Sequence, residues 1–554
     1  MSEQRDAEYR RQHPSALPRL NEQQRATVEE YGRRREFAAG DHLIRAGDTE
    51  FRFQLLVSGR VEIVDRSSGT PRTLLVHVPG EFLGDLANLA GRASNVDAVA
   101  LGAVVVHELS LPQLQQLSSD RSDLSDLILQ AFIARSAALV GRADFMGIRV
   151  IGSQYSRDTF RIRDFLARND VLYTWMDVET DDEVGALLDK LRVGPQETPV
   201  VSYADDWLLR NPSNAELARR LGLRRTAPQG TVYDLVIVGG GPAGLAAAVY
   251  SASEGLATIV LEGHSPGGQA AGSARIENYL GFPTGISGAD LTSRAVLQAR
   301  KFGATLSTPA NVTGLRVGAK FKVLELAGGE TITAKALLIA SGADYRQLQV
   351  PGRERFDSTG VYYAATPVEA EMCAGGQVAV VGAGNSAGQG AIYMAQRVSR
   401  VYLVVRGDDP ARTMSHYLLQ RIAETPNIEV LTNSEITAIH GEQTVDRVEL
   451  TDNVTGEKRD LAVSGVFSFI GAVPCTTWLP DDIRTDRRGF VLTGQQVAGD
   501  AWPHPHRPPF LLETSQPGVF AAGDVRSASV KRVASAVGEG AMAVQYVHQY
   551  LNEI

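Results

Sequence analysis

Two glycine-rich turns, each placed between an apolar strand and a helix, constrain this sequence more than any other feature. The first lies in DLVIVGGGPAGLAAAVYSASEG, which has the GxGxxG pattern, and a second strand, TIVLEG, follows it. Only glycine permits the tight turn and the close approach of backbone to a pyrophosphate, and a carboxylate after the second strand can accept hydrogen bonds from ribose hydroxyls. We therefore predict a dinucleotide site formed by Gly239, Gly241, Pro242, Ala243, Gly244 and Glu262.

The second turn lies in QVAVVGAGNSAGQGAIYMAQ and has the G-x-G-x-x-A variant of the pattern. Its candidate nucleotide-binding residues are Gly382, Gly384, Asn385, Ser386 and Ala387. The strand that follows, VYLVVRG, ends in Arg406 instead of an acid. A cation there suits a 2′-phosphate, which predicts NADPH in preference to NADH, although NADH stays possible. The alternative is that Arg406 is a surface residue after a strand.

The second turn can also be read as GNSAG, the GxSxG pattern of a hydrolase nucleophile, with Ser386 at its centre. The preceding Gly382 and the likeness to the first turn favour nucleotide binding over a serine nucleophile. Two dinucleotide sites in one chain are the arrangement expected for hydride transfer from a nicotinamide to a flavin.

The C-terminal segment GVFAAGDVRSASVKRVASAVGEG supplies a third signature. It places Gly523 and Asp524 at the end of an expected strand, where we expect Asp524 to bind the ribitol or phosphate region of FAD. The helix that opens near Arg532, Val533 and Ala534 is expected to face the flavin ring.

Taken together, residues 231–554 resemble the bacterial-type, low-molecular-weight thioredoxin reductases. The resemblance includes SPGGQAAGSARIENYLGFPTGISGADL, LIASGADYR, FIGAVP and GVFAAGDV. It implies that Gly268, Gln269, Glu277, Asn278 and Gly342 lie around FAD. It also implies a split FAD-binding domain, 231–345 and 473–554, with an NAD(P)H-binding domain, 346–472, inserted between the two parts.

The chain departs from that family at the redox centre. The family carries a redox-active CxxC just before the second glycine-rich turn, and here AATP stands in its place, with Ala364 and Pro367 at the cysteine positions. Without two thiols no disulfide can relay electrons from the flavin, so we name no catalytic residue. The chain has two cysteines, Cys373 and Cys475, and we interpret both as packing residues without excluding a redox role for Cys373.

Two further modules are expected before residue 231. Residues 18–140 resemble a cyclic-nucleotide-binding β-roll with C-terminal helices, in which Gly84 and Asp85 suit the ribose-binding pair. The family's Arg-Ala-Ala-Thr is replaced by SNVDA at 94–98, with Arg92 two positions early and Asp97 adding a negative charge. A cyclic nucleotide is therefore doubtful, and a degenerate structural or signalling β-roll is favoured.

Residues 147–225 resemble a glutaredoxin- or thioredoxin-like domain. Thr198–Pro199 matches the cis-proline turn of such domains, but Ser156 and Thr159 stand where their two cysteines would be. We expect a docking or structural module. The predicted fold is thus multidomain: an antiparallel β-roll plus helices, a small thioredoxin-like α/β domain, and a Rossmann-like FAD/NADPH flavoprotein.

Composition excludes several other classes. The formal charge is −9 and the pI is near 5.7, which argues against nucleic-acid binding. The first residues have no apolar core and no run of about 18 apolar residues occurs, so we expect a cytoplasmic protein without signal peptide or membrane span. His504 and His506 could suggest a metal, but a proline-rich loop explains them, and we predict no metal site.

The favoured function is an FAD-dependent NAD(P)H oxidoreductase that passes electrons from NADPH, through FAD, to an acceptor not reached through an internal CxxC. That acceptor is an unidentified small molecule or redox protein. The alternative is a redox- or nucleotide-responsive regulatory scaffold, and a genuine thioredoxin reductase that uses external thiols is least favoured. Family analogy suggests a homodimer.

Overall fold

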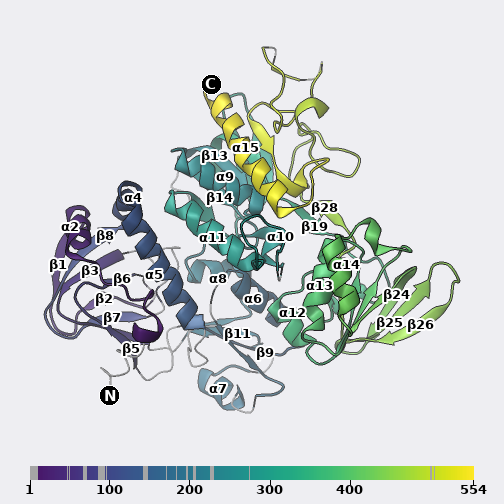
Figure 1. Ribbon diagram of the computed structural model, residues 1–554, viewed down its shortest axis with the longest axis horizontal. Coiled ribbons are helices and arrows are strands. Elements are labelled where there is room, and N and C mark those ends of the chain that lie inside the picture. Colours follow the sequence, from purple (N-terminus) through teal and green to yellow (C-terminus); the bar gives the residue numbers. More distant parts are fainter. Residues whose placement is uncertain are drawn as a thin grey trace. The chain divides into compact units, whose positions relative to one another are not determined.

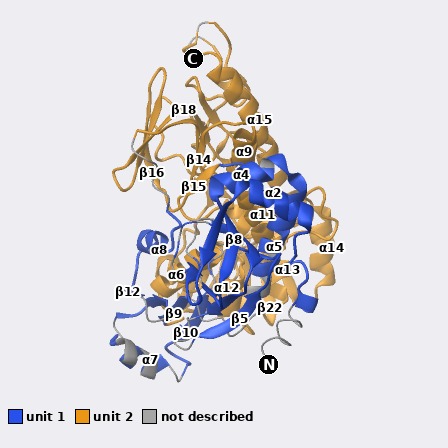
Figure 2. Ribbon diagram, turned by 90° about the vertical axis from the view of Figure 1, so that its left-hand side faces the viewer, with its two compact units in different colours: residues 1–152, 170–224, 301–303 blue, residues 153–169, 225–300, 304–554 orange. Residues whose placement is uncertain are grey.

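The computed structural model divides into two compact units (Figures 1 and 2). One unit comprises residues 1–152, 170–224 and 301–303, and the other comprises 153–169, 225–300 and 304–554. The residues described are 10–554 except 47, 49, 51, 66–70, 85–93, 95, 141–147, 170, 172, 182, 183, 195, 196, 204–206, 225–229, 274, 500, 501 and 505. Within them, no helix combines the length and apolar character that a membrane crossing requires.

The first unit begins with helix α2 (Glu22–Tyr31) and two four-stranded antiparallel sheets. Their strand orders are β1-β8-β3-β6 and β2-β7-β4-β5. The bounds are β1 (Arg33–Phe37), β2 (His42–Ile44), β3 (Arg52–Ser58), β4 (Val61–Asp65), β5 (Arg72–His77), β6 (Phe82–Leu83), β7 (Asp97–Ala100) and β8 (Val104–Ser110). Helices α4 (Leu111–Asp120) and α5 (Ser122–Val140) follow, which confirms the predicted helical stretch. Phe53, Phe82 and Phe132 are fully buried in the core that α5 shares with the β1-β8-β3-β6 sheet.

The same unit contains a third sheet, which is mixed and has the strand order β10-β9-β11-β12. Its strands are β9 (Ile148–Gly152), β10 (Tyr173–Asp177), β11 (Val200–Tyr203) and β12 (Trp207–Arg210). Helices α7 (Val184–Leu191) and α8 (Asn214–Arg220) accompany it, and Thr198–Pro199 is a cis peptide. Helix α6 (Arg157–Arg168), which connects β9 and β10 in sequence, groups with the other unit. That 147–225 is a thioredoxin-like domain stays a prediction.

The second unit contains a seven-stranded sheet with the order β15-β14-β13-β18-β17-β16 and β29 paired to β18. Its strands are β13 (Val232–Val238), β14 (Thr258–Leu261), β15 (Thr305–Ser307), β16 (Val312–Val317), β17 (Lys322–Leu326), β18 (Thr331–Ile339) and β29 (Val519–Ala521). The helices are α9 (Pro242–Ser253), α10 (Gly268–Ala271), α11 (Gly288–Lys301) and α15 (Val533–Leu551), with a short 3-10 turn η5 (Gly523–Val525). Strands β13, β14, β15 and β29 join the sheet in parallel pairs, and their apolar runs are largely buried, as expected where both faces are covered.

A second parallel sheet, β20-β27-β21-β22-β23, and an antiparallel sheet, β24-β25-β26, form the inserted part. The strands are β20 (Val361–Tyr362), β21 (Gln377–Val381), β22 (Arg400–Val404), β23 (Ile428–Leu431), β24 (Ser434–Gly441), β25 (Val445–Asp452), β26 (Lys458–Ala462) and β27 (Gly465–Ser468). Helices α12 (Pro367–Met372), α13 (Asn385–Ala395) and α14 (His416–Glu424) accompany them, with 3-10 turns η2 (Arg353–Phe356), η3 (Pro410–Arg412) and, later in the chain, η4 (Gly494–Gln496). The chain enters through β19 (Ala343–Tyr345) and leaves through β28 (Ala472–Pro474), which pair with each other.

Two helices far apart in sequence, α9 and α15, lie side by side over the seven-stranded sheet (Figure 1). Their backbones approach so closely that a methyl group added at Gly540 would lie 2.0 Å from the carbonyl oxygen of Ala243. This packing brings the C-terminal segment against the first glycine-rich turn.

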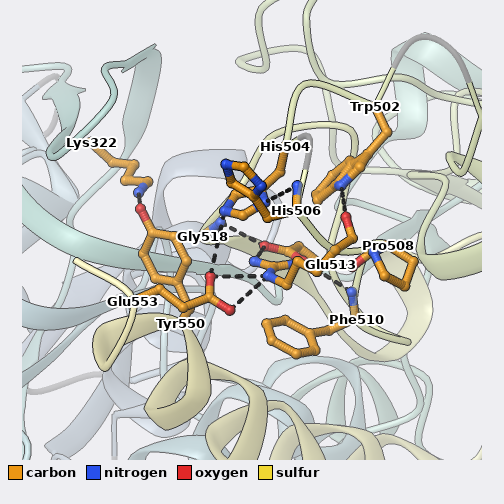
Figure 3. A network of polar contacts seen from close by, with 11 residues as sticks. Lys322, Trp502, His504, His506, Pro508, Phe510, Glu513, Gly518, Tyr550 and Glu553 are labelled. Atoms are coloured by element: carbon orange, nitrogen blue, oxygen red, sulfur yellow. Dashed lines mark hydrogen bonds and ion pairs between the residues drawn. The ribbon is translucent and has the colours of Figure 1, made fainter.

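A buried polar network stabilises the C-terminal end of α15 (Figure 3). The side chain of Lys322 is fully buried, and its Nζ donates to the hydroxyl of Tyr550 at 2.5 Å and to the carbonyl of Lys335 at 2.9 Å. Burial lowers the pKa of Lys322 to about 8, although the nearby carboxylate of Glu513 opposes the shift. Glu513 is itself fully buried and accepts from Arg507.

We expect Lys322 to make stability rise with pH. Between about pH 8 and the unfolded value near 10.5, the folded protein holds this lysine neutral while the unfolded chain still binds its proton. The thermal midpoints of wild type and Lys322→Met should therefore diverge across this window. The free energy of unfolding of wild type should rise by about 2 kcal/mol relative to that of the variant. Lys335→Met is the control, because Lys335 is partly exposed beside Asp234. Parallel profiles for wild type and Lys322→Met would contradict the expectation.

Candidate functional site

The first glycine-rich turn connects β13 to α9 and admits no side chain at two of its glycines. Gly239 has φ +105°, and a methyl group there would lie 2.2 Å from the carbonyl oxygen of Ala340. At Gly244 it would lie 1.9 Å from the carbonyl oxygen of Gly239. Helix α9 therefore begins directly against the end of the strand, with Gly241 as its N-cap and Pro242 at its first position. This leaves the first backbone N–H groups of α9 open to an anion.

Glu262, after β14, is held beside this turn by backbone donors. Its Oε2 accepts from the N–H of Gly240 at 2.6 Å and its Oε1 from the N–H of His264 at 2.9 Å. Each oxygen keeps a lone pair, so the carboxylate is oriented and can accept from a hydroxyl. The predicted pairing of turn and acid is thus present in the geometry.

The start of α10 faces the start of α9. A methyl group at Gly268, where φ is +55°, would lie 3.1 Å from the Cα of Gly241. Gln269 donates through Nε2 to the carbonyl of Ala343, immediately after Gly342. Asn278, by contrast, is exposed in the loop closed by the Ile276–Ile286 bridge and hydrogen-bonds to none of the other described candidate residues.

The C-terminal signature contributes a carboxylate without a partner. Asp524, in η5, is half-buried, and within the described part of the chain its carboxylate has no hydrogen bond or ion pair. Burial raises the pKa of Asp524, while Lys531 acts in the opposite direction. Its neighbour Gly523 donates its N–H to Glu539, which Arg526 also contacts. A desolvated, unpaired carboxylate suits a ligand hydroxyl.

Helix α15 opens nearby without a side-chain cap. Arg532 is its N-cap and makes no side-chain capping bond, so the first amides of the helix, beginning at Val533 and Ala534, have no such acceptor. A flavin dinucleotide fits this arrangement of four features: the glycine turn at 239–244, the oriented Glu262, the carboxylate of Asp524 and the start of α15. These residues would hold FAD.

The second glycine-rich turn, between β21 and α13, repeats the first. Gly382 has φ +141°, and a methyl group there would lie 2.5 Å from the carbonyl oxygen of Phe469. Gly384 is the N-cap of α13 and has open space around it, whereas Ala387 is fully buried. Asn385 accepts from the N–H of Ser415, which ties the turn to the start of α14. This turn fits the phosphates of a second nucleotide.

The two arginines after β22 differ. Arg406 is exposed, and within the described residues its guanidinium makes no ion pair, while Arg412 binds Asp408 at 2.9 Å. Arg406 is therefore the cation available to a 2′-phosphate. Ser386 is exposed, and among the described residues no histidine hydrogen-bonds to it, so no general base is placed to activate a serine nucleophile.

The AATP turn, residues 364–367, begins α12. Thr366 is the N-cap and Pro367 the first helical residue, and Glu369 accepts from the N–H and hydroxyl of Thr366 in a capping box. A methyl group on Gly272, at the end of α10, would lie 3.6 Å from the Cβ of Ala364, so the turn contacts the FAD-binding half.

The two cysteines provide no thiolate at neutral pH. Cys373, at the end of α12, is 2% exposed within the apolar core of the inserted part, and burial raises its pKa to about 12. Burial, together with Asp344, also raises the pKa of Cys475 to about 12. A buried thiol with so high a pKa is a poor nucleophile.

The described candidate residues of the β-roll, Gly84 and Asp97, make contacts within the protein. Asp85 and Arg92 lie outside the described residues, and the carbonyl of Gly84 accepts from Arg135. Asp97 is buried and accepts from the N–H of Ala46. Sequence reasoning missed Glu81, a fully buried carboxylate in the same segment; although burial opposes ionisation, hydrogen bonds from His77 and Arg10 hold its pKa at about 2.

The hydroxyl residues at the thioredoxin-like turn also have structural roles. Ser156 caps α6 by accepting from the N–H of Thr159, and Thr159 is buried.

His504 and His506 lie beside the network of Figure 3, where the Nε2 of His504 is 3.9 Å from Glu553.

Sequence reasoning missed three residues beside the AATP turn: Tyr345, Glu369 and Arg168. Burial raises the pKa of Glu369, whereas the positive charge of Arg168, in α6, lowers it. Burial also raises the pKa of Tyr345, which the charge of Arg168 lowers. No local pattern could have indicated this set, because its members come from three distant segments.

Comparison with known proteins gives two matches to family profiles. Residues 233–540 match the family described as pyridine nucleotide-disulphide oxidoreductase, and residues 34–121 match the cyclic nucleotide-binding domain. The thioredoxin reductase of Bacillus subtilis is 33% identical over 325 residues, which cover 58% of this chain and 96% of that protein. The bifunctional thioredoxin reductase/thioredoxin of Mycobacterium leprae is 33% identical over 323 residues, covering 58% of this chain and 67% of that protein.

Solved structures give the same result. The thioredoxin reductase of Lactococcus lactis in its FR conformation has a TM-score of 0.53 and 29% identity, covering 58% of this chain and all of that chain. The thioredoxin reductase of T. acidophilum has a TM-score of 0.52 and 30% identity, and the match covers 58% of this chain and 99% of that chain.

The α9–α15 contact gives a direct test of the flavin site. Gly540→Ala should force the two helices apart and lower both FAD retention and the thermal midpoint, at a cost of about 2 kcal/mol or more. Gly538→Ala is the matched control, because open space surrounds Gly538 and alanine favours a helix. Flavin content after gel filtration measures the effect. Equal flavin content in both variants would contradict this role of the contact.

Proposed function

This chain belongs to the pyridine nucleotide-disulphide oxidoreductase family, and on that premise we propose that it passes electrons from NADPH to an acceptor that is not reached through an enzyme-borne disulfide. It is an FAD-dependent NAD(P)H oxidoreductase, since its relatives are thioredoxin reductases. The observation that carries the proposal is the AATP turn, where Ala364 and Pro367 stand at the expected cysteine positions.

The chain's own residues divide the work between two sites. Bound FAD would supply the capacity to accept a hydride from the nicotinamide and release electrons one or two at a time. Glu262 and Asp524 would bind hydroxyls of the flavin nucleotide, the first amides of α9 would bind its pyrophosphate, and the opening of α15 would face the flavin ring. The turn at Gly382–Ala387 would hold the nicotinamide nucleotide. None of these roles requires a thiol.

The raised pKa values of both cysteines support a route without thiols. A disulfide relay needs a thiolate to attack and a second thiol to resolve the mixed disulfide. Cys373 is enclosed in an apolar core and Cys475 follows β28, and the pKa of each is raised to about 12. We therefore propose that the acceptor is a quinone, another small molecule, oxygen or a redox protein that accepts electrons from the flavin directly.

Anaerobic NADPH titration tests the proposal. We expect NADPH to bleach the visible flavin band, and the Cys373→Ser/Cys475→Ser double variant to bleach and then reduce small acceptors within about twofold of wild type. An absence of bleaching with both NADPH and NADH would contradict the oxidoreductase. Loss of acceptor reduction in the double variant, with bleaching intact, would instead indicate a thiol relay.

We propose that Arg406 selects NADPH. Because its guanidinium has no competing carboxylate, Arg406→Ala should raise the KM for NADPH about tenfold or more, as expected for the loss of a charge-assisted contact. The KM for NADH should change by less than about twofold. Arg412→Ala is the matched control, because Asp408 already neutralises Arg412. Equal effects of Arg406→Ala on both coenzymes would exclude this role.

Three further parts of the proposal concern partners and location. By analogy with the thioredoxin reductases we propose a homodimer, and we place the protein in the cytoplasm. For the β-roll we propose a structural or signalling role without a cyclic nucleotide, because Asp97 adds a negative charge where an anion would bind.

A further inference from the structure

Helix α6 groups by its contacts with residues 225–300 and 304–554, whereas the strands that flank it in sequence, β9 and β10, belong to the other unit. It is rich in arginine, with Arg157, Arg161, Arg163 and Arg168 among its twelve residues. A helix assigned to the reductase unit in this way must make specific contacts there.

The polar contacts of α6 lie on both sides of the AATP turn. Arg157 donates to the backbone carbonyls of Glu354 and Arg355, in η2. Arg163 is 3% exposed and binds the carboxylate of Glu371, in α12, at 2.5 Å. A buried arginine paired across two elements fixes their relative position, because breaking the pair leaves a buried charge.

An apolar contact and a second charge complete the interface. The ring of Phe160 lies 5.9 Å from that of Tyr362, just before the turn, and Phe160 packs against the core of the inserted part. At the C-terminal end of the helix, Arg168 forms an ion pair with Asp164 of the same helix at 2.6 Å. The two charges shift the pKa of Glu369, which caps the turn through Thr366, in opposite directions. Helix α6 therefore contacts the segments before and after residues 364–367.

We propose that α6 is a specificity-determining cap, which keeps protein acceptors from the AATP turn and restricts electron transfer to small acceptors. This inference rests on the proposed function, in which electrons leave the flavin without a thiol. A specific protein partner needs about 800 Å² of surface on each side. Helix α6 occupies part of the surface on both sides of the turn, at residues 354–355, Tyr362 and Glu371. A small acceptor needs only access to the flavin.

The cap is tested first by hydrogen exchange on the FAD-loaded full chain, a readout that does not depend on turnover. Arg163→Glu places like charges opposite each other at Glu371, and we expect amides of 157–168 and 366–373 to exchange about tenfold faster. Arg163→Glu/Glu371→Arg should restore protection. Arg161→Glu, which makes the same charge change on a residue paired within the helix to Asp158, is the matched control. Unchanged exchange in both Arg163→Glu and Arg157→Glu/Arg163→Glu would contradict the cap.

The second test compares a small acceptor, ferricyanide, with a protein probe, cytochrome c. Each NADPH supplies two electrons and reduces two molecules of either acceptor, with release of NADP⁺ and a proton. In Arg163→Glu the rate with cytochrome c relative to ferricyanide should rise about fivefold or more, and in Arg161→Glu and the restored pair it should match wild type. Faster exchange without a change in this ratio would overturn the inference.

The two proposals fail in different ways. If NADPH does not bleach the flavin in wild type, the proposed function is wrong, and the exchange experiment still decides whether α6 is held as described. If bleaching is normal in every variant and the acceptor ratio does not respond to Arg163→Glu, the cap alone is wrong.

Discussion

The close packing of α9 against α15 is the contact on which the flavin-binding half depends. Gly540 allows the backbone of α15 to reach that of α9 at Ala243, and Gly244 allows α9 to reach the end of β13. These helices belong to segments separated by the whole inserted part, so their contact joins the two pieces of a split domain. It also places Asp524 and the open end of α15 near the turn at Gly239.

The two glycine-rich turns share one backbone arrangement, which suits two different nucleotides. In both, a glycine with positive φ lies against the carbonyl of a neighbouring strand, and a glycine N-cap leaves the helix amides open. The difference lies in the residue after the next strand, which is Glu262 in one case and Arg406 in the other. A carboxylate accepts from hydroxyls, whereas a cation attracts a phosphate, so the charge at this position separates the sites chemically.

Residues in the two turns where cysteines were expected have structural roles. Ser156 caps α6, Thr159 is buried, and Thr366 caps α12 with Glu369 as its partner. The hydroxyl of Ser156 and the capping box of Thr366 and Glu369 thus stabilise the starts of α6 and α12. Arg163 and Phe160 join α6 to the inserted part at Glu371 and Tyr362, on either side of the AATP turn.

The sequence by itself indicated the two nucleotide-binding turns, because glycine turns and apolar strands encode local geometry that does not depend on distant residues, and its resemblance to the thioredoxin reductases implied the reductase fold. The profile matches and the solved structures confirm that part, as well as the β-roll family at 34–121, whereas the domain boundaries, the thioredoxin-like domain and the individual site roles stay predictions. The place of Cys373 in an apolar core agrees with its interpretation as a packing residue. Only the tertiary structure decided that α6 joins the reductase unit and that, within the described residues, the carboxylate of Asp524 makes no hydrogen bond or ion pair. These facts depend on contacts between segments hundreds of residues apart, and no local pattern in a sequence records which side chains such contacts bury or leave unpaired.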